Sequence, residues 1–288
     1  MTAVTGVTRI LPRSFLYVPG NRPDLFVKGA AGPADALVLD LEDAVPVPDR
    51  AAARREVIAW LGGRTPAATG PEVWVRVSPD FLAEDLGAAV RPGVQGLFIA
   101  KCSAEHLDAA SQMMAALEEE RGTSRLDVVG LVETAAAVRD LARIAAHPRI
   151  TTLGIGEVDL LGDLRMTRSP RTAAAVDALR TQVVMHCSAA GRAAPVAPTS
   201  TDFRDLAAFE DSTHHLLDLG FRSRTAIHPS QIDVIHTATS PSPETLAQAQ
   251  EIVDQFSRAK GGITLDARGR LIDAAVVREA VETLARRR

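Results

Sequence analysis

A short apolar segment followed by a helical one occurs eight times in succession along this chain. The apolar segments have the length of strands, and strict alternation with helices indicates a parallel sheet. Eight such units in about 220 residues match a closed (β/α)₈ barrel, the TIM barrel. An open doubly wound sheet is the alternative, but it would more often carry a glycine-rich nucleotide loop, and the sequence shows none. The predicted strands are residues 14–19, 36–42, 72–77, 96–101, 128–133, 150–156, 193–199 and 225–228.

The character of the sequence changes after residue 239. Residues 240–243 (SPSP) read as a linker, and an amphipathic helix is expected over 244–260. A hairpin is expected between residues 263 and 273, followed by a final helix over 274–287. We therefore predict a barrel domain, residues 1–239, and a C-terminal helix–hairpin–helix extension, residues 240–288, that acts as a lid or an oligomerisation arm.

Charge and composition exclude several classes of protein. The net charge is −4, so no overall basic field favours nucleic acid or a membrane surface. No apolar run reaches the ~18 residues of a membrane helix, and the start of the chain lacks the apolar core of a signal peptide. The two cysteines, Cys102 and Cys187, form neither a disulfide framework nor a metal-type pair. These features predict a cytoplasmic protein.

One predicted strand runs directly into a group of acids. Residues 36–39 are apolar, and Asp40, Glu42 and Asp43 follow. An unpaired buried carboxylate is very costly, so these acids are expected where the strand emerges from the core. The alternative is a solvated turn with helix-capping acids. In a (β/α)₈ barrel the carboxyl ends of the strands form the active site. The other predicted strand ends carry Arg22, Arg76, Lys101, Glu133, Asp159 and His228.

Glu133 and Asp159 follow neighbouring predicted strands. Two carboxylates with open water positions suit Mg²⁺, which prefers oxygen ligands and keeps several waters. A Zn²⁺ site would need His or Cys neighbours, which this pattern lacks. The alternatives are that Glu133 is a helix N-terminal residue favoured by the dipole and that Asp159 is a helix cap.

Three basic residues are candidates for binding anions. Arg76 ends a buried strand, and its planar guanidinium suits a carboxylate or an enolate. A salt bridge to Glu42 or Asp43 is the alternative, and the two roles are compatible. Arg22 and Lys28, on the loop and helix after the first strand, could hold phosphates at the rim; solvated surface charges are the alternative.

These segments together resemble the citrate lyase β-subunit-like CoA-ester lyases within the HpcH/HpaI aldolase family. The resemblance covers about residues 13–285, although the chain departs from the family pattern at Ala100, Val158 and Ala194. The matching motifs are RSFLYVPG at 13–20, LDLEDAV at 39–45, VRV at 75–77, VET at 132–134, GEVDL at 156–160, IHPSQ at 227–231 and LIDA at 271–274.

The resemblance implies a (β/α)₈ barrel, trimeric or hexameric, that requires Mg²⁺. It implies cleavage of a 3-hydroxyacyl-CoA, such as malyl-, citramalyl- or citryl-CoA, into an acyl-CoA and a 2-oxo acid. No Schiff base is needed, so Lys101 is expected to contribute structure or charge. The roles carried over by motif are metal binding by Glu133 and Asp159, holding of metal-bound waters by Glu42 and Asp43, substrate binding by Arg76, CoA phosphate binding by Arg22 and Lys28, and closure over a neighbouring subunit's site by Asp273.

Other activities remain open at this point. A malyl-CoA-type thioesterase would use the same site, with water attacking the thioester. An aldolase for a free hydroxy-oxo acid would need no CoA, and Arg22 and Lys28 argue against it. A non-catalytic subunit that binds an acyl-thioester would need no metal. Asp273 itself has a simpler alternative as the N-cap of the helix that begins at Ala274.

Overall fold

The computed structural model describes residues 9–64, 70–259, 262–266 and 269–287. By their internal contacts these residues form two compact units, Met1–Ile235 and His236–Arg288. The division falls inside helix α10 (Ser230–Thr239), and we propose that the barrel domain extends to the end of this helix, at residue 239. The predicted helix end at Lys260 and the predicted turn at Ala267 and Arg268 lie outside the described residues.

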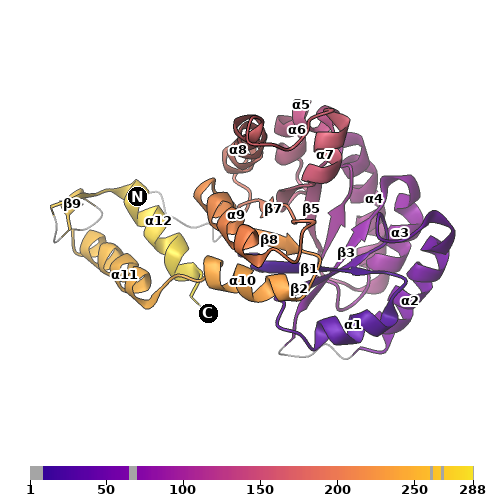
Figure 1. Cartoon of the computed structure of the whole chain (residues 1–288). Helices are drawn as coiled ribbons and strands as arrows, with labels where there is room; N and C mark the ends of the chain where they lie inside the picture. The colour runs from indigo at the N-terminus through magenta and orange to yellow at the C-terminus, as the bar shows by residue number, and fades with distance from the viewer. Residues whose placement is uncertain (1–8, 65–69, 260–261, 267–268, 288) are drawn as a thin grey trace. The chain divides into compact units, whose positions relative to one another are not determined.

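The first unit is the predicted closed barrel. Eight parallel strands follow one another in chain order, and β1 pairs with β8 to close the sheet. In Figure 1 the strands lie at the centre with the helices around them. The strands are β1 (Ser14–Pro19), β2 (Ala36–Asp40), β3 (Glu72–Val77), β4 (Gly96–Ile99), β5 (Asp127–Val132), β6 (Thr152–Ile155), β7 (Val196–Ala197) and β8 (Ser223–Ala226).

Helices follow the strands as the alternating pattern predicts. Clear local signals set some of their ends: in α4 the Ser103 hydroxyl accepts a hydrogen bond from the His106 amide, and Gly122, with φ 61°, terminates the helix. The helices of this unit before α10 are α1 (Pro23–Ala30), α2 (Arg50–Gly62), α3 (Leu82–Ala89), α4 (Ala104–Arg121), α5 (Ala135–Arg139), α6 (Leu141–Ala146), α7 (Glu157–Asp163), α8 (Ala173–Ala189) and α9 (Leu206–Asp218), with short 3₁₀ turns at Val47–Asp49 and Pro79–Phe81.

Three local predictions were wrong. Between the strands predicted at 128–133 and 150–156, where the alternating pattern predicts one helix, there are two, α5 and α6, that meet at Asp140. Helix α7 was not predicted at all, because seven residues are too few to show a helical period. Strand β8 ends at Ala226, so His228 is an exposed residue of the following loop, where its ring stacks on Phe203 at 4.8 Å.

Side chains from alternate strand residues fill the inside of the barrel. Phe15, Trp74 and Phe98 meet there edge to face, with ring centroids 5.2–5.6 Å apart. Because side chains alternate along a strand, the residues two positions further on, such as Tyr17 and Arg76, stand on the same inner face and nearer the carboxyl end. The aromatic layer therefore forms the floor of a site at that end.

The second unit has the predicted helix–hairpin–helix order. Its elements after α10 are α11 (Pro243–Arg258), the antiparallel pair β9 (Thr264–Leu265) and β10 (Leu271–Ile272), and α12 (Ala274–Ala285), and α11 packs against α12. Its role as a lid or an oligomerisation arm stays a prediction. Among the helices that the structure describes, none combines the length and the apolar character needed to cross a membrane.

Candidate active site

Arg76 lies near the carboxyl end of β3, paired with Asp40. The two residues are register partners on β3 and β2. Arg76 Nε and Nη2 donate hydrogen bonds to the two Asp40 carboxylate oxygens, at 2.7 and 2.5 Å. Both side chains are largely buried, and the guanidinium carbon lies 4.9 Å from the centre of the Tyr17 ring. Asp40 thus fixes the Nε and Nη2 edge of the guanidinium, and Nη1 remains for other partners.

Asp40 also folds the loop that carries the other two acids. Its carboxylate accepts hydrogen bonds from the Glu42 amide (2.9 Å) and the Ala44 amide (3.1 Å), which turns the chain as soon as the strand ends. Arg76 Nη1 then lies 3.0 Å from Glu42 Oε2 and 3.2 Å from Asp43 Oδ2. The predicted salt bridges of Arg76 to Glu42 and Asp43 are confirmed, but Asp40, its principal partner, was not predicted in this role.

Glu133 is a buried carboxylate in the same mouth, 3% exposed. It directly follows β5, and Thr134 caps helix α5, so Glu133 is not the helix N-terminal residue of the alternative interpretation. Its Oε2 accepts a hydrogen bond from the Lys101 amide at 2.6 Å. Burial raises the pKa of Glu133 to about 7, against the hydrogen bond from Lys101 and the charge of Arg76, which lower it.

Asp159 lies close enough to Glu133 to raise the pKa of that carboxyl further. It is partly exposed and sits in the first turn of α7; it does not cap that helix, which begins after Gly156. The two carboxylates predicted from neighbouring strands thus act on each other electrostatically at the carboxyl end of the barrel. In the part of the chain that the structure describes, no set of three or more His, Cys, Asp or Glu side chains forms a metal cluster.

The two carboxylates fit Mg²⁺ in their chemistry. Mg²⁺ is commonly held by one or two carboxylates together with waters and substrate oxygens, so a third protein ligand is not required. The backbone also makes room for Glu133, because a Cβ atom on Gly156 would lie 2.4 Å from Glu133 Oε1. Glycine at this position lets the carboxylate rest against the chain segment that leads to Asp159.

Arg22 and Lys28 lie where the sequence places them, after β1. Arg22 precedes α1 and Lys28 is in its last turn, and both side chains are more than half exposed. Asp24 pairs with both: two hydrogen bonds of 2.9 Å join it to Arg22, and Lys28 Nζ lies 3.9 Å away. Both cations are accessible to an anion, and Asp24 is a competing partner.

Asp273 belongs to the second unit and caps α12. Its Oδ1 accepts hydrogen bonds from the Ala275 amide (2.8 Å) and the Val276 amide (3.0 Å). These backbone hydrogen bonds lower the pKa of Asp273. The capping role that the sequence suggested is thus confirmed.

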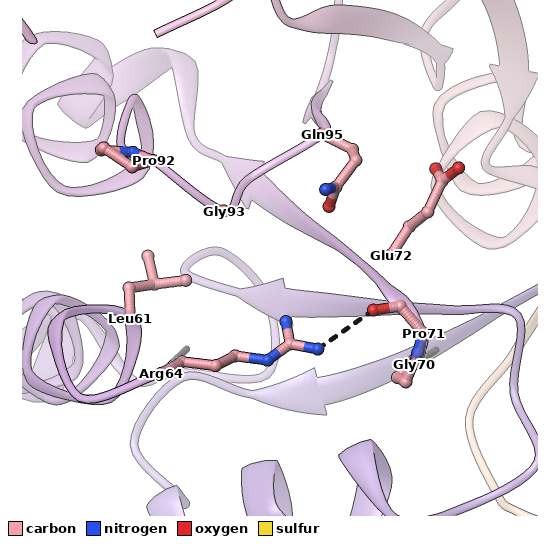
Figure 2. A pocket seen from close by; sticks show the side chains of 8 residues that line it. All are labelled: Leu61, Arg64, Gly70, Pro71, Glu72, Pro92, Gly93 and Gln95. Carbon is pink, nitrogen blue, oxygen red and sulfur yellow. Dashed lines mark hydrogen bonds between the residues drawn. The ribbon is translucent and has the colours of Figure 1, made fainter. Parts of the chain in front are cut away.

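A pocket elsewhere on the barrel is lined by none of the candidate active-site residues. Figure 2 shows it beside Glu72, at the amino end of β3, with Arg64 donating a hydrogen bond to the Pro71 carbonyl at 3.2 Å. Arg9 and Trp74 already bind the Glu72 carboxylate. This end of a (β/α)₈ barrel usually contributes stability rather than chemistry.

A closed parallel barrel with an arginine and acidic side chains at the carboxyl ends of its strands defines the class: a TIM-barrel enzyme with a charged site at that end. The chain belongs to the HpcH/HpaI aldolase/citrate lyase family, whose sequence model matches residues 13–229.

Relatives in this family are similar over nearly the whole chain. A citrate lyase subunit beta-like protein of Deinococcus radiodurans is 30% identical over 94% of this chain and 95% of its own length. An L-malyl-CoA/beta-methylmalyl-CoA lyase of Cereibacter sphaeroides is 28% identical over 93% of this chain and 92% of its own length. The crystal structure of CitE from Mycobacterium tuberculosis in complex with magnesium, acetoacetate and coenzyme A has a TM-score of 0.74 and 28% identity, and the match covers 95% of this chain and 97% of that one.

Proposed function

We propose that this protein is a Mg²⁺-dependent carbon–carbon lyase that cleaves a 3-hydroxyacyl-CoA, such as malyl-, citramalyl- or citryl-CoA, into an acyl-CoA and a 2-oxo acid. The observation that carries the proposal is the grouping of Arg76 with Glu133 and Asp159 in one barrel mouth. The names of the relatives and the magnesium and coenzyme A of the CitE complex support it.

The reaction requires charge to be stabilised at two places. The 3-hydroxyl group loses its proton, the bond between C2 and C3 breaks, and C3 becomes the carbonyl carbon of the 2-oxo acid. The electron pair of the broken bond passes to C2 and the thioester oxygen as an enolate. One proton added at C2 then gives the acyl-CoA.

Arg76 suits the charge that develops during this reaction. Asp40 fixes the Nε and Nη2 edge, so the guanidinium needs no reorientation when a negative oxygen forms nearby. Glu133 and Asp159 would hold Mg²⁺, which when bound polarises the carbonyl of the 2-oxo acid. Glu42 and Asp43, on the loop beside Arg76, would orient waters at the same site.

Arg22 and Lys28 are proposed to bind the phosphates of CoA. Both are exposed cations on the loop and helix after β1, and phosphates would compete with Asp24 for them. A substrate without CoA would leave this pair without a role.

Asp273 is proposed to act in the site of a neighbouring subunit, as the group that transfers the proton at C2. This requires a homo-oligomer, a trimer or a hexamer. The hairpin next to Asp273 exposes Ile263 (74%), Leu265 (58%) and Leu271 (54%), which supports contact with another subunit. The Asp273 carboxylate would become available for proton transfer when it gives up its hydrogen bonds to the Ala275 and Val276 amides.

The test is a panel of acyl-CoAs crossed with 2-oxo acids, with products identified by mass spectrometry, with and without Mg²⁺. The proposal predicts a Mg²⁺-dependent 3-hydroxyacyl-CoA from at least one pair. Free CoA without an acyl-CoA product from the hydroxyacyl-CoA would indicate a thioesterase, and cleavage of free hydroxy-oxo acids would indicate an aldolase. Binding of acyl-thioesters with no product from any pair would indicate a non-catalytic subunit.

A further inference from the structure

Lys101 has an unusual backbone for its residue type. It lies in the short turn after β4, and its φ is 44°, in the left-handed region that residues with a side chain rarely adopt. Such strain persists only where the surrounding structure fixes it, and it gathers at functional sites. The contacts of Lys101 show what fixes it.

Both the backbone and the side chain of Lys101 reach the carboxylates of the site. Its amide donates the 2.6 Å hydrogen bond to Glu133, and its carbonyl lies 3.1 Å from His106 Nδ1. Its ammonium donates a hydrogen bond to Glu42 Oε1 and lies 3.7 Å from Asp43 Oδ1. One residue thus joins the carboxylate that follows β5 to the two on the loop after β2.

Ammonium side chains are rare in this chain. The only lysines among its 32 Lys and Arg residues are Lys28, Lys101 and Lys260. An ammonium is a compact point charge, whereas a guanidinium is a broad planar fork. Burial lowers the pKa of Lys101, but Glu42 and Asp43 outweigh burial and raise it overall, so the side chain stays charged.

We propose that Lys101 is a positioning residue whose ammonium is the built-in counter-cation of Glu42 and Asp43. By occupying these two carboxylates it keeps them from binding the divalent cation directly and confines that cation to Glu133 and Asp159. This inference rests on the proposed function. Arg76 pairs with Glu42 Oε2, whereas Lys101 pairs with Oε1. Removal of the ammonium should therefore free Glu42 Oε1 as a ligand and leave the mouth more negative, so Mg²⁺ should bind more tightly while turnover falls. Damage to the fold would instead weaken both Mg²⁺ binding and turnover.

The experiment is a calorimetric titration of the full-length protein with MgCl₂ and no substrate, at about pH 8, because Mg²⁺ affinity depends on ligand deprotonation. Lys101→Met removes the charge and retains the length of the side chain, and Lys101→Arg retains the charge. Arg139→Gln is the matched control, because it removes an exposed positive charge whose partner is Asp140. The expected result is about tenfold or tighter binding for Lys101→Met and a change within about twofold for the other two.

Unchanged or weaker Mg²⁺ binding by Lys101→Met would overturn the inference about Lys101. The proposed metal site would stand, because the wild type would still bind the ion. A wild type that binds no Mg²⁺ would overturn the proposed metal site and this inference with it. If Lys101→Met folds only in the presence of MgCl₂, the melting temperatures of the variant and the wild type are measured at increasing Mg²⁺ concentrations, and the two rises are compared. The proposal predicts a larger Mg²⁺-induced rise than in the wild type, and an equal or smaller rise contradicts it.

Discussion

Arg76 donates two parallel hydrogen bonds to Asp40 across neighbouring strands, at 2.7 and 2.5 Å. The pair lies at matched positions of β2 and β3, so the sheet itself sets the orientation of the guanidinium. This geometry depends on the planar fork of arginine, which a lysine does not have.

Arg76→Lys should therefore lower turnover about 100-fold or more, the scale seen when one preorganised donor is lost from an active site. Positive charge is retained in this variant, so the loss would report donor geometry. Steady-state kinetics with the substrate found in the product panel measure it. Near-normal kcat with a raised KM would instead show that Arg76 binds the ground state and the transition state alike.

Gly156→Ala should weaken Mg²⁺ binding about tenfold or more, the scale of losing support around a metal ligand. The new Cβ would lie 2.4 Å from Glu133 Oε1 and 2.5 Å from its Cγ, so the Glu133 side chain must move. Gly162→Ala is the matched control on α7, because a Cβ there meets no atom within 4 Å. Equal Mg²⁺ affinities in the two variants, measured by calorimetry, would contradict this account.

Glu133→Gln should stabilise the metal-free protein at high pH. The pKa of Glu133 is raised from 4.5 to about 7, chiefly by burial. The folded state thus binds this proton more tightly than the unfolded chain, and stability falls as pH rises between these two values. Urea unfolding in the presence of a chelator measures the free energy of unfolding. For Glu133→Gln it should exceed the wild-type value by up to about 3 kcal/mol near pH 8 and by about 1 kcal/mol or less near pH 5. A gain that does not change with pH would be inconsistent with a raised pKa.

Asp273→Asn subunits and Arg76→Ala subunits should each be inactive alone and should recover activity when mixed after dissociation. Recovery is expected because some sites would combine an intact Arg76 with an intact Asp273 from the neighbour. Activity of the mixed oligomers, verified by native mass spectrometry, is the measurement. Full activity of Asp273→Asn by itself would limit this residue to capping α12, and mixed oligomers without activity would show that sites are not shared.

The barrel and its strand ends were predictable because alternating apolar strands and helices leave few topologies open. The grouping of Glu42, Asp43, Arg76, Glu133 and Asp159 followed from that fold alone. Helix α7, which carries Asp159, was missed because it is too short to show a period.

The role of Asp40 was missed because it depends on strand register, which an apolar run does not reveal. The alternation along β3 offered a partial signal, since Arg76 lies two residues after Trp74 on the inner face. The left-handed backbone of Lys101 had no signal, because its residue type gives no hint of a positive φ.

The most direct test of the metal site at the centre of this account is Mg²⁺ binding by the Glu133→Ala, Asp159→Ala double variant, measured by calorimetry beside the wild type. We expect binding by the wild type, no measurable binding by a double variant with an unchanged circular dichroism spectrum, and loss of the Mg²⁺-dependent product. Retained Mg²⁺ affinity in the folded double variant would place the metal elsewhere and contradict the account.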